Sequence, residues 1–274
     1  MRDVSMLAVV AAAFVWAAPA LAGNGIYDVS IDGNTATADV SLGGVSATLT
    51  IRFENVVGLN ADNLGLSARL VDPVAGLAGR LPSGVSLASA FPLVVKVAPP
   101  ASGGLSFSGV VAVEIYTHDL HYTPGSPLRM FSAPDGGSFT DFTTIVSSGS
   151  IRTGSSKPDF SEFIIAADVR PLAAVIQSKY SKLAALLEQH AGVMGSSLYG
   201  ELSSLHNASQ NAYSGGNLAA AIEYLEAFSD KVVAASGSPL PDVWRSSRDV
   251  TNVAGSLRSA ASTLRYSLTL ASNA

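Results

Sequence analysis

The sequence predicts β and α structure in separate domains, an N-terminal antiparallel β-sandwich followed by a C-terminal four-helix up-and-down bundle. From Gly25 to about Val169, short runs with β-branched residues are separated by Gly, Pro, Asn and Asp, without a helical stretch between them. Such a pattern is typical of an antiparallel sandwich. After Pro171, leucines recur at helical spacing. We therefore expect a sandwich over residues 23–169 and a helical bundle over residues 170–274.

Residues 1–22 have the pattern of a secretory signal peptide. A charged start is followed by an apolar run over Met6–Ala18 and by the small residues of a cleavage site at Ala20–Ala22. We predict cleavage between Ala22 and Gly23, and a periplasmic or secreted mature chain. An N-terminal membrane anchor is the alternative, but the apolar run is short for a bilayer and is followed by a proline.

Composition narrows the classes of partner. The 274 residues include 16 basic and 21 acidic side chains, which give a formal net charge of −5, and no basic tract is present. This disfavours nucleic acid and anionic membrane surfaces as partners. The chain has no cysteine, so disulfides and thiolate metal sites are excluded. No cofactor motif is found, and no later apolar run predicts membrane insertion after signal cleavage.

The first half contains runs with the two-residue period of half-buried strands. In Val45–Phe53, apolar residues alternate strictly with Ser, Thr and Arg, which predicts a strand with one face on a core. The sequence Asp-Gly-Asn-Thr at Asp32–Thr35 predicts a tight hairpin turn. Several such strands joined by turns favour an Ig-like sandwich. The other predicted strands are Ile26–Ile31, Ala36–Leu42, Leu64–Val71, Leu93–Val97, Phe107–Tyr116, Leu128–Phe131, Phe139–Val146 and Phe163–Ala167.

Four amphipathic helices are predicted after a domain boundary within Ala167–Ala173. Asn217 follows two glycines and is placed to cap the third helix. The fourth helix follows Pro241 and Asp242, which suit the first turn of a helix. Trp244, near that start, is predicted to cover one end of the bundle core. The apolar residues of the four helices fall within residues 172–187, 198–205, 218–232 and 250–268.

The segment Tyr116–Gly125 gathers two tyrosines, two histidines and an aspartate at the end of a predicted strand. Aromatic and imidazole groups suit a ligand-binding surface, so Tyr116, His118, His121 and Tyr122 are candidate ligand-binding residues. A metal site is disfavoured because the two histidines are three positions apart and point to opposite faces of a regular strand. A strand end without a binding role is the alternative.

The residues of Pro134–Gly137 favour a reversing turn over a catalytic role, because Pro, Asp and Gly each suit a turn position. Carboxylates would support glycan hydrolysis only if two of them converged in a cleft with shifted pKa values. The candidates for that role are Glu114, Asp119, Asp135 and Asp141. No nucleophile elbow, phosphate-binding loop or calcium loop is present.

Two resemblances extend this interpretation. Ser126–Arg170 and Pro241–Ser272 resemble an uncharacterised family of secreted Gram-negative bacterial proteins, over nearly the whole mature chain. That resemblance implies no activity. Leu198–Gly237 is similar to the FIMAH-type helical module, in which a helix ends before Gly-Asn and the next carries Leu-x-x-Phe and ends in Ser-Gly. Such modules are appended to extracellular bacterial enzymes and adhesins, which implies binding or structural work without catalytic residues.

Together these patterns predict a secreted, noncatalytic binding or structural protein of the cell envelope or exterior, with a glycan or another envelope protein as its partner. The predicted signal peptide and the absence of a recognisable catalytic motif favour it. One alternative is a polysaccharide or cell-wall hydrolase of unrecognised type that uses the sandwich carboxylates. Another is a periplasmic module that binds a protein partner through its helices.

Overall fold

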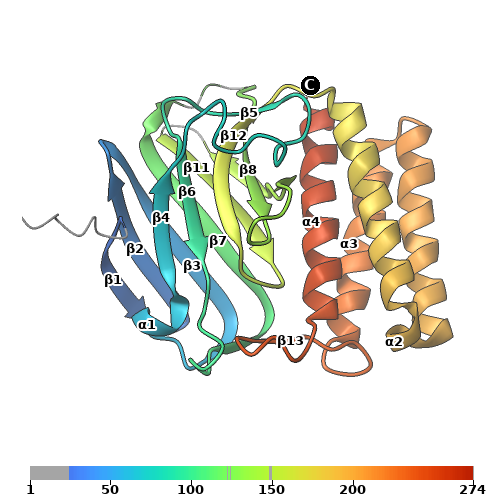
Figure 1. The fold of residues 1–274 in the computed structure, drawn as a ribbon. Helices are drawn as coiled ribbons and strands as arrows, with labels where there is room; N and C mark the ends of the chain where they lie inside the picture. Colours follow the sequence, from blue (N-terminus) through green and yellow to red (C-terminus); the bar gives the residue numbers. More distant parts are fainter. Residues whose placement is uncertain (1–24, 122, 124, 148–149, 274) are drawn as a thin grey trace, which may run out of the picture.

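The computed structural model describes residues 25–121, 123, 125–147 and 150–273. As predicted, antiparallel strands come first and long helices follow, and the helices stand to one side of the sheets (Figure 1). The predicted signal peptide and its cleavage site at Ala22 and Gly23 lie outside the described residues. Within the described part of the chain, no helix combines the length and apolar character needed to cross a membrane.

The first sheet contains β1 Ile26–Asp32, β2 Thr35–Leu42, β3 Val45–Val57, β7 Ser106–His121, β10 Ile145–Ser147, β11 Ser150–Lys157 and β13 Val243–Arg245. Its order is β1-β2-β3-β7-β11-β10, with β13 also paired to β7, and its pairings are antiparallel. The predicted turn at Asp32–Thr35 joins β1 to β2, and these two residues lie opposite each other. The tight turn therefore sets the register of this hairpin.

The second sheet contains β4 Leu66–Leu70, β5 Val85–Leu87, β6 Leu93–Val97, β8 Leu128–Ala133, β9 Thr140–Asp141 and β12 Glu162–Asp168. Its order is β4-β6-β12-β8-β9, and β5 pairs with β12. A short helix, α1 Ala61–Leu64, precedes β4. The predicted strand Phe139–Val146 is instead divided between β9 and β10, which belong to different sheets.

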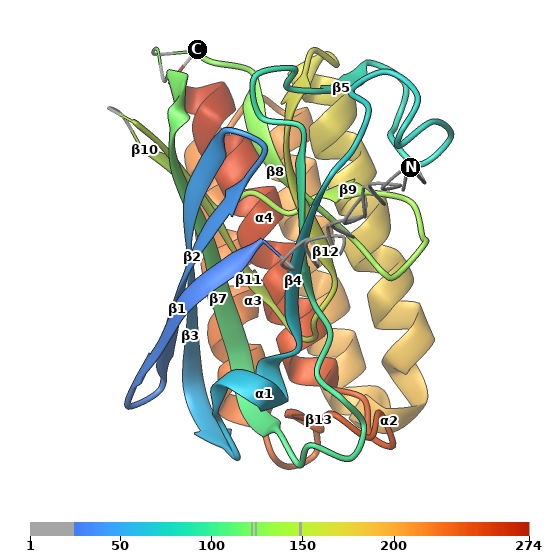
Figure 2. The same cartoon turned by 60° about the vertical axis from the view of Figure 1, so that its left-hand side comes forward.

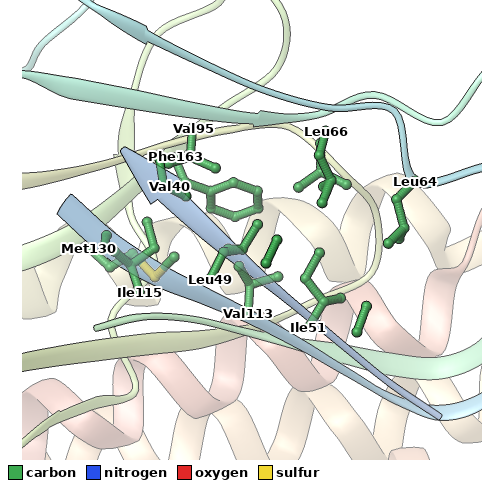
Figure 3. Close-up of a cluster of buried hydrophobic side chains, with 14 of the residues drawn as sticks. Val40, Leu49, Ile51, Leu64, Leu66, Val95, Val113, Ile115, Met130 and Phe163 are labelled. Carbon is green, nitrogen blue, oxygen red and sulfur yellow. The ribbon is translucent and has the colours of Figure 1, made fainter. Parts of the chain in front are cut away.

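The two sheets pack against each other around one hydrophobic core (Figure 3). Leu49 and Ile51 come from β3, Val113 and Ile115 from β7, and Phe163 from β12, and all five are fully buried. Along β3 the buried positions alternate with more exposed ones, as the two-residue period predicts. Each such side chain contributes about 1.5–3 kcal/mol by leaving water.

The helical region contains α2 Leu172–Ser214, α3 Leu218–Ala235 and α4 Val253–Ser272. α2 reverses at Gly195, where a φ of 73° interrupts the helix, so the region has four helical arms. Glycine permits this conformation because it has no Cβ. Tyr180 and Ser209 share a hydrogen bond of 2.7 Å between the two arms of α2. All four arms contribute to one apolar core that includes Leu183, Leu202, Leu225, Phe228, Leu257 and Leu264.

The start of α4 differs from the prediction. Pro241 and Asp242 do not form its first turn; they lead into β13. The helix begins at Val253, after Asn252. The Asn252 side chain accepts a hydrogen bond of 2.7 Å from the Gly255 N–H, which satisfies one of the free donors of the first turn.

Trp244 lies in the core between the sheets, and the prediction that it covers an end of the helical core is wrong. Its ring stacks on Phe107, with centroids 5.3 Å apart, and meets the edge of Phe160 at 5.1 Å. The pairing of β13 with β7 places it there. The connection between α3 and α4 therefore returns to the sheet, which helical periodicity alone does not reveal.

Helix α4 packs beside the strands and contacts β7 and β11 (Figures 1 and 2). Arg258 of α4 makes two hydrogen bonds, of 2.6 and 2.8 Å, to the Glu54 carboxylate of β3. The Asn252 side chain donates a hydrogen bond of 2.6 Å to the Gly109 carbonyl of β7. These contacts hold the helices beside the sheets and position the cleft between them.

Candidate functional site

Three lysines come together in a cleft between the second sheet and the helices. The cleft consists of two cavities of about 360 Å³ each, and Ser138, Thr140 and Lys182 line both. We call it the lysine cleft, after Lys157, Lys179 and Lys182 in its lining. Lys157 ends β11, and the other two lysines project from α2. Two segments that are distant in the sequence therefore bring positive charge to one place.

Lys157 is buried at the end of the first sheet, with 4% of its side chain exposed. Its Nζ donates a hydrogen bond of 2.6 Å to Ser161 Oγ and another to Ser132 Oγ. The Asp159 carboxylate lies 3.4 Å away, and the Phe142 ring centroid lies at 4.6 Å. Burial lowers the pKa of the Lys157 ammonium, and Asp159 opposes that shift only in part.

Lys182 lies in the cleft: the residue as a whole is exposed, but protein atoms crowd around its ammonium. Its Nζ is 4.2 Å from the Phe142 ring centroid and 3.5 Å from Thr140 Oγ1. The pKa of Lys182 is lowered to about 8, first because the surrounding protein desolvates the ammonium and then because Lys157 and Lys179 repel it. A cation with such a pKa is close to neutrality under mildly basic conditions.

Lys179 and Asp141 form a buried ion pair that joins α2 to β9. Lys179 Nζ is 2.6 Å from Asp141 Oδ2, and both side chains are more than 90% buried. The same ammonium donates to the Thr263 carbonyl at 3.0 Å and to Ser267 Oγ at 2.9 Å, both on α4. Burial alone would raise the pKa of Asp141, but the charge of Lys179 brings it below its usual value. Because its partners are all supplied by the protein, we assign this pair a structural role.

Ser259 of α4 lines the same cavity as Lys157 and Lys182. The residue is 1% exposed, and its Oγ makes no hydrogen bond with any residue that the structure describes. A buried hydroxyl without a partner is costly, by about 1–3 kcal/mol. The cleft thus offers both positive charge and an unused hydroxyl donor.

The predicted ligand-binding residues lie outside this cleft. Tyr116 and His118 lie on β7 and contact each other, with Tyr116 Oη 3.1 Å from His118 Nε2 and ring centroids 4.9 Å apart. His121 ends the same strand, where the pairing with β11 is irregular. Tyr122 lies outside the described residues. The structure therefore brings together Tyr116 and His118, and their role in binding stays a prediction.

The predicted carboxylates have different partners. Asp119 accepts a hydrogen bond of 2.6 Å from a backbone N–H of β3, and Asp135 pairs with Lys96 at 2.7 Å. Asp141 belongs to the buried ion pair described above, while Glu114 lies on β7 in the first sheet. In the part of the chain that the structure describes, no three His, Asp or Glu side chains gather as they would around a metal ion.

Apart from Asp141, the charged and hydroxyl residues of the lysine cleft were missed by sequence reasoning. Ser132, Lys157 and Lys182 match no motif with a fixed spacing, and they meet because β8, β11 and α2 meet. The available signal was weak: Lys157 and Ser161 flank a Pro-Asp-Phe turn between two predicted strands. Such a lysine is more often solvated than buried, so its sequence position alone did not single it out.

Comparison with known proteins identifies a family but no characterised relative. No curated protein matches this chain, and no solved structure does. The model of one family matches residues 10–272, which is nearly the whole sequence, and its description is a family of unknown function. This confirms the resemblance to an uncharacterised family. The chain therefore belongs to the family of unknown function DUF6689.

Proposed function

We propose that this protein is a secreted binding protein of the bacterial cell envelope or exterior, and that the lysine cleft binds an acidic carbohydrate. One observation carries the proposal: the ammonium of Lys182 lies near two other lysines, and no carboxylate of a described residue lies within 4 Å of it. A carboxylate of the ligand would supply the opposite charge and relieve the repulsion among the lysines. Binding of this kind needs no catalytic group.

The predicted cellular location and the predicted architecture support the proposal. A signal peptide over residues 1–22 would export the chain, and acidic saccharides are abundant outside the cytoplasm. We take the two sheets as an Ig-like sandwich and the helical arms as an up-and-down bundle that includes a FIMAH-type module at Leu198–Gly237. The cleft lies where strands and helices meet, and ligand sites commonly form between such parts.

Replacing Lys182 tests the proposal directly. We expect Lys182→Met to weaken binding of an oligogalacturonate at least about tenfold, because a charge-assisted hydrogen bond contributes about 1.5–3 kcal/mol. Binding should also weaken with added salt, since the cleft is open to solvent. Isothermal titration calorimetry on the full chain would measure both effects. A neutral oligogalactoside of the same length should bind far more weakly than the acidic one.

Lys231→Met is the matched control for this experiment. Lys231 lies on α3 and forms an ion pair with Glu201, so the substitution removes the same charge away from the cleft. It should leave the affinity within about twofold of wild type. If Lys182→Met and Lys231→Met lost the same affinity for oligogalacturonate, the loss would come from the change in net charge alone, and the proposal would be contradicted. Equal affinity for the acidic and neutral saccharides would contradict it as well.

Binding should depend on pH through Lys182. Its charged neighbours are Lys157 and Lys179, which disfavour the ammonium, and Asp159 and Asp141, which favour it. Because the pKa is about 8, the ammonium is present at pH 7 and is largely lost at pH 9. The affinity for oligogalacturonate should therefore fall about tenfold between these pH values. Lys182→Arg keeps its charge in this range, so the affinity of that variant should depend little on pH. If its affinity instead falls with pH as steeply as that of the wild type, Lys182 is not the titrating group.

A further inference from the structure

Two serines and a lysine form a closed hydrogen-bond network in the wall of the lysine cleft. Lys157 Nζ contacts both Ser132 Oγ and Ser161 Oγ, and the two hydroxyl oxygens are 2.9 Å apart. All three residues line the same cavity. Anion binding by Lys182 does not require this network. A serine hydroxyl in contact with a lysine amine is, however, an arrangement that activates serine as a nucleophile.

The surroundings of Lys157 suit an amine that takes up a proton. Its Nζ lies 4.6 Å from the Phe142 ring centroid and 5.3 Å from that of Phe163, so water has little access to the ammonium. Desolvation lowers the pKa of Lys157, and the Asp159 carboxylate at 3.4 Å only partly offsets this. A lysine acts as a general base only when it is neutral, and burial favours that form.

We propose that Ser161 is a nucleophile for acyl transfer, that Lys157 is its general base, and that the substrates are esters carrying a carboxylate. Ser161 is favoured over Ser132 because it is the more exposed of the two, at 6% against 2%. Ser161 also lines a second cavity, on the side of Lys96 and Asp135, whereas Ser132 lines only the cleft among the cavities described here. The carboxylate of the substrate is assigned to Lys182, and this part rests on the proposed function.

The proposed step conserves atoms and charge. Ser161 Oγ bonds to the ester carbonyl carbon while its proton passes to the neutral Lys157 Nζ. The bond from that carbon to the leaving oxygen then breaks, and Lys157 returns the proton to the departing alcohol. Water repeats the sequence on the acyl-serine: its oxygen bonds to the carbonyl carbon while one of its protons passes to the neutral Lys157 Nζ. The bond from that carbon to Ser161 Oγ then breaks, Lys157 gives the proton to Ser161 Oγ, and a carboxylic acid is released.

Ser259 provides a second, independent observation at the same cavity. Its buried Oγ lacks a hydrogen-bond partner among the residues described, and it lines the cavity together with Lys157 and Ser161. Acyl transfer places negative charge on the carbonyl oxygen, which hydrogen-bond donors stabilise. An unused hydroxyl donor beside the proposed nucleophile is therefore consistent with this reaction class.

Covalent labelling of the full chain with a neutral alkyl fluorophosphonate tests the proposal. Attack by a serine forms a phosphorus–oxygen bond, and fluoride leaves. Peptide mass spectrometry should place the label on Ser161, and Ser161→Ala should abolish it. Ser246→Ala is the matched control, because Ser246 is also buried but its hydroxyl contacts only a backbone carbonyl. That variant should be labelled at the wild-type rate, and absence of label on wild-type Ser161 would overturn the proposal.

Lys157→Arg separates a base from a structural cation. Arginine keeps the positive charge and the donors but does not accept a proton at these pH values. A base role predicts labelling about 100-fold slower than wild type, whereas a structural role predicts the wild-type rate and would overturn the proposal. A measurement on the wild-type chain avoids any folding defect of the variant: the labelling rate should rise as Lys157 loses its proton with increasing pH. A flat profile would also overturn the proposal.

The substrate class is tested separately by turnover. Mono-p-nitrophenyl adipate should be hydrolysed faster than p-nitrophenyl hexanoate, since only the adipate ester carries a carboxylate for Lys182. Equal rates would remove the charge preference, and hydrolysis of neither ester would exclude the ester class. Because the fluorophosphonate is neutral, labelling of Ser161 in a chain that does not bind oligogalacturonate would retain the nucleophile and reject the proposed function alone.

Discussion

Asp141→Ala is expected to lower the free energy of unfolding by about 3–5 kcal/mol, because it leaves the buried ammonium of Lys179 without its counter-charge. The ion pair is short, at 2.6 Å, and both side chains are almost fully enclosed. Lys179 would retain its hydrogen bonds to Thr263 and Ser267, but neither of these neutral groups replaces a carboxylate. Urea unfolding followed by circular dichroism would measure the loss.

A double variant separates the cost of a broken pair from the contribution of the intact pair. Asp141→Leu combined with Lys179→Met removes both charges and keeps apolar volume, so its stability should return to within about 1–2 kcal/mol of wild type. Glu201→Ala breaks the exposed pair with Lys231 and should cost less than about 1 kcal/mol. A loss for Asp141→Ala as small as that of Glu201→Ala would show that Lys179 is not effectively buried.

The ion pair between Asp141 and Lys179 also determines where Lys182 lies in the lysine cleft. Asp141 ends β9, and Lys179 lies one helical turn before Lys182 on α2. Lys179 also reaches α4 through Thr263 and Ser267. The ion pair therefore holds α2 and α4 against the second sheet in the wall of one of the two cavities, the one that Lys182 also lines. We expect the buried pair to position Lys182, rather than to bind ligand itself.

Local patterns predicted the elements that depend on local interactions. The alternation in β3 was visible in the sequence because one face of that strand is buried. Asn217 does cap α3, and its side chain accepts a hydrogen bond of 3.0 Å from the Ala220 N–H. The turn at Pro134–Gly137 is also confirmed, since the Gly137 N–H donates to the Pro134 carbonyl at 2.8 Å. In each case, the residues that determine the geometry are neighbours in the chain.

Features that depend on distant residues were not predictable from these patterns. β13 is a strand of three residues, Val243–Arg245, and it pairs with Ser106–Ser108 on the edge of β7 opposite β3, where β11 pairs only from Val111 onward. The lysine cleft likewise combines side chains from β8, β11, α2 and α4. Neither hydrophobic periodicity nor motif spacing predicts such contacts between residues that are distant in the sequence. The polar cluster around Tyr116 was visible precisely because its members are adjacent in sequence, and adjacency alone did not place it in a cavity.

Trp244→Ala should cost about 3–5 kcal/mol of unfolding free energy, the range for removing a large buried aromatic side chain. Trp244 is 7% exposed and contacts both Phe107 and Phe160. Its loss would leave a cavity between the sheets. Trp244→Phe keeps one ring in contact and should lose only part of this stability. Tyr224→Ala is the surface control, because Tyr224 lies on α3 with 40% exposed, and it should stay within about 0.5 kcal/mol of wild type.

The same substitution should loosen the connection between the sheets and the helices. Trp244 anchors the segment between α3 and α4, whose Asp242 carbonyl accepts a hydrogen bond of 2.9 Å from the Gly109 N–H of β7. Without the indole, the three-residue strand β13 retains only backbone pairing, so its amides should exchange with solvent faster than those of β3. Hydrogen exchange measured by mass spectrometry distinguishes local loosening around β13 from destabilisation of the whole chain. Uniform acceleration along the chain would indicate general destabilisation, whereas acceleration centred on β13 and the start of α4 would show that Trp244 is the local anchor.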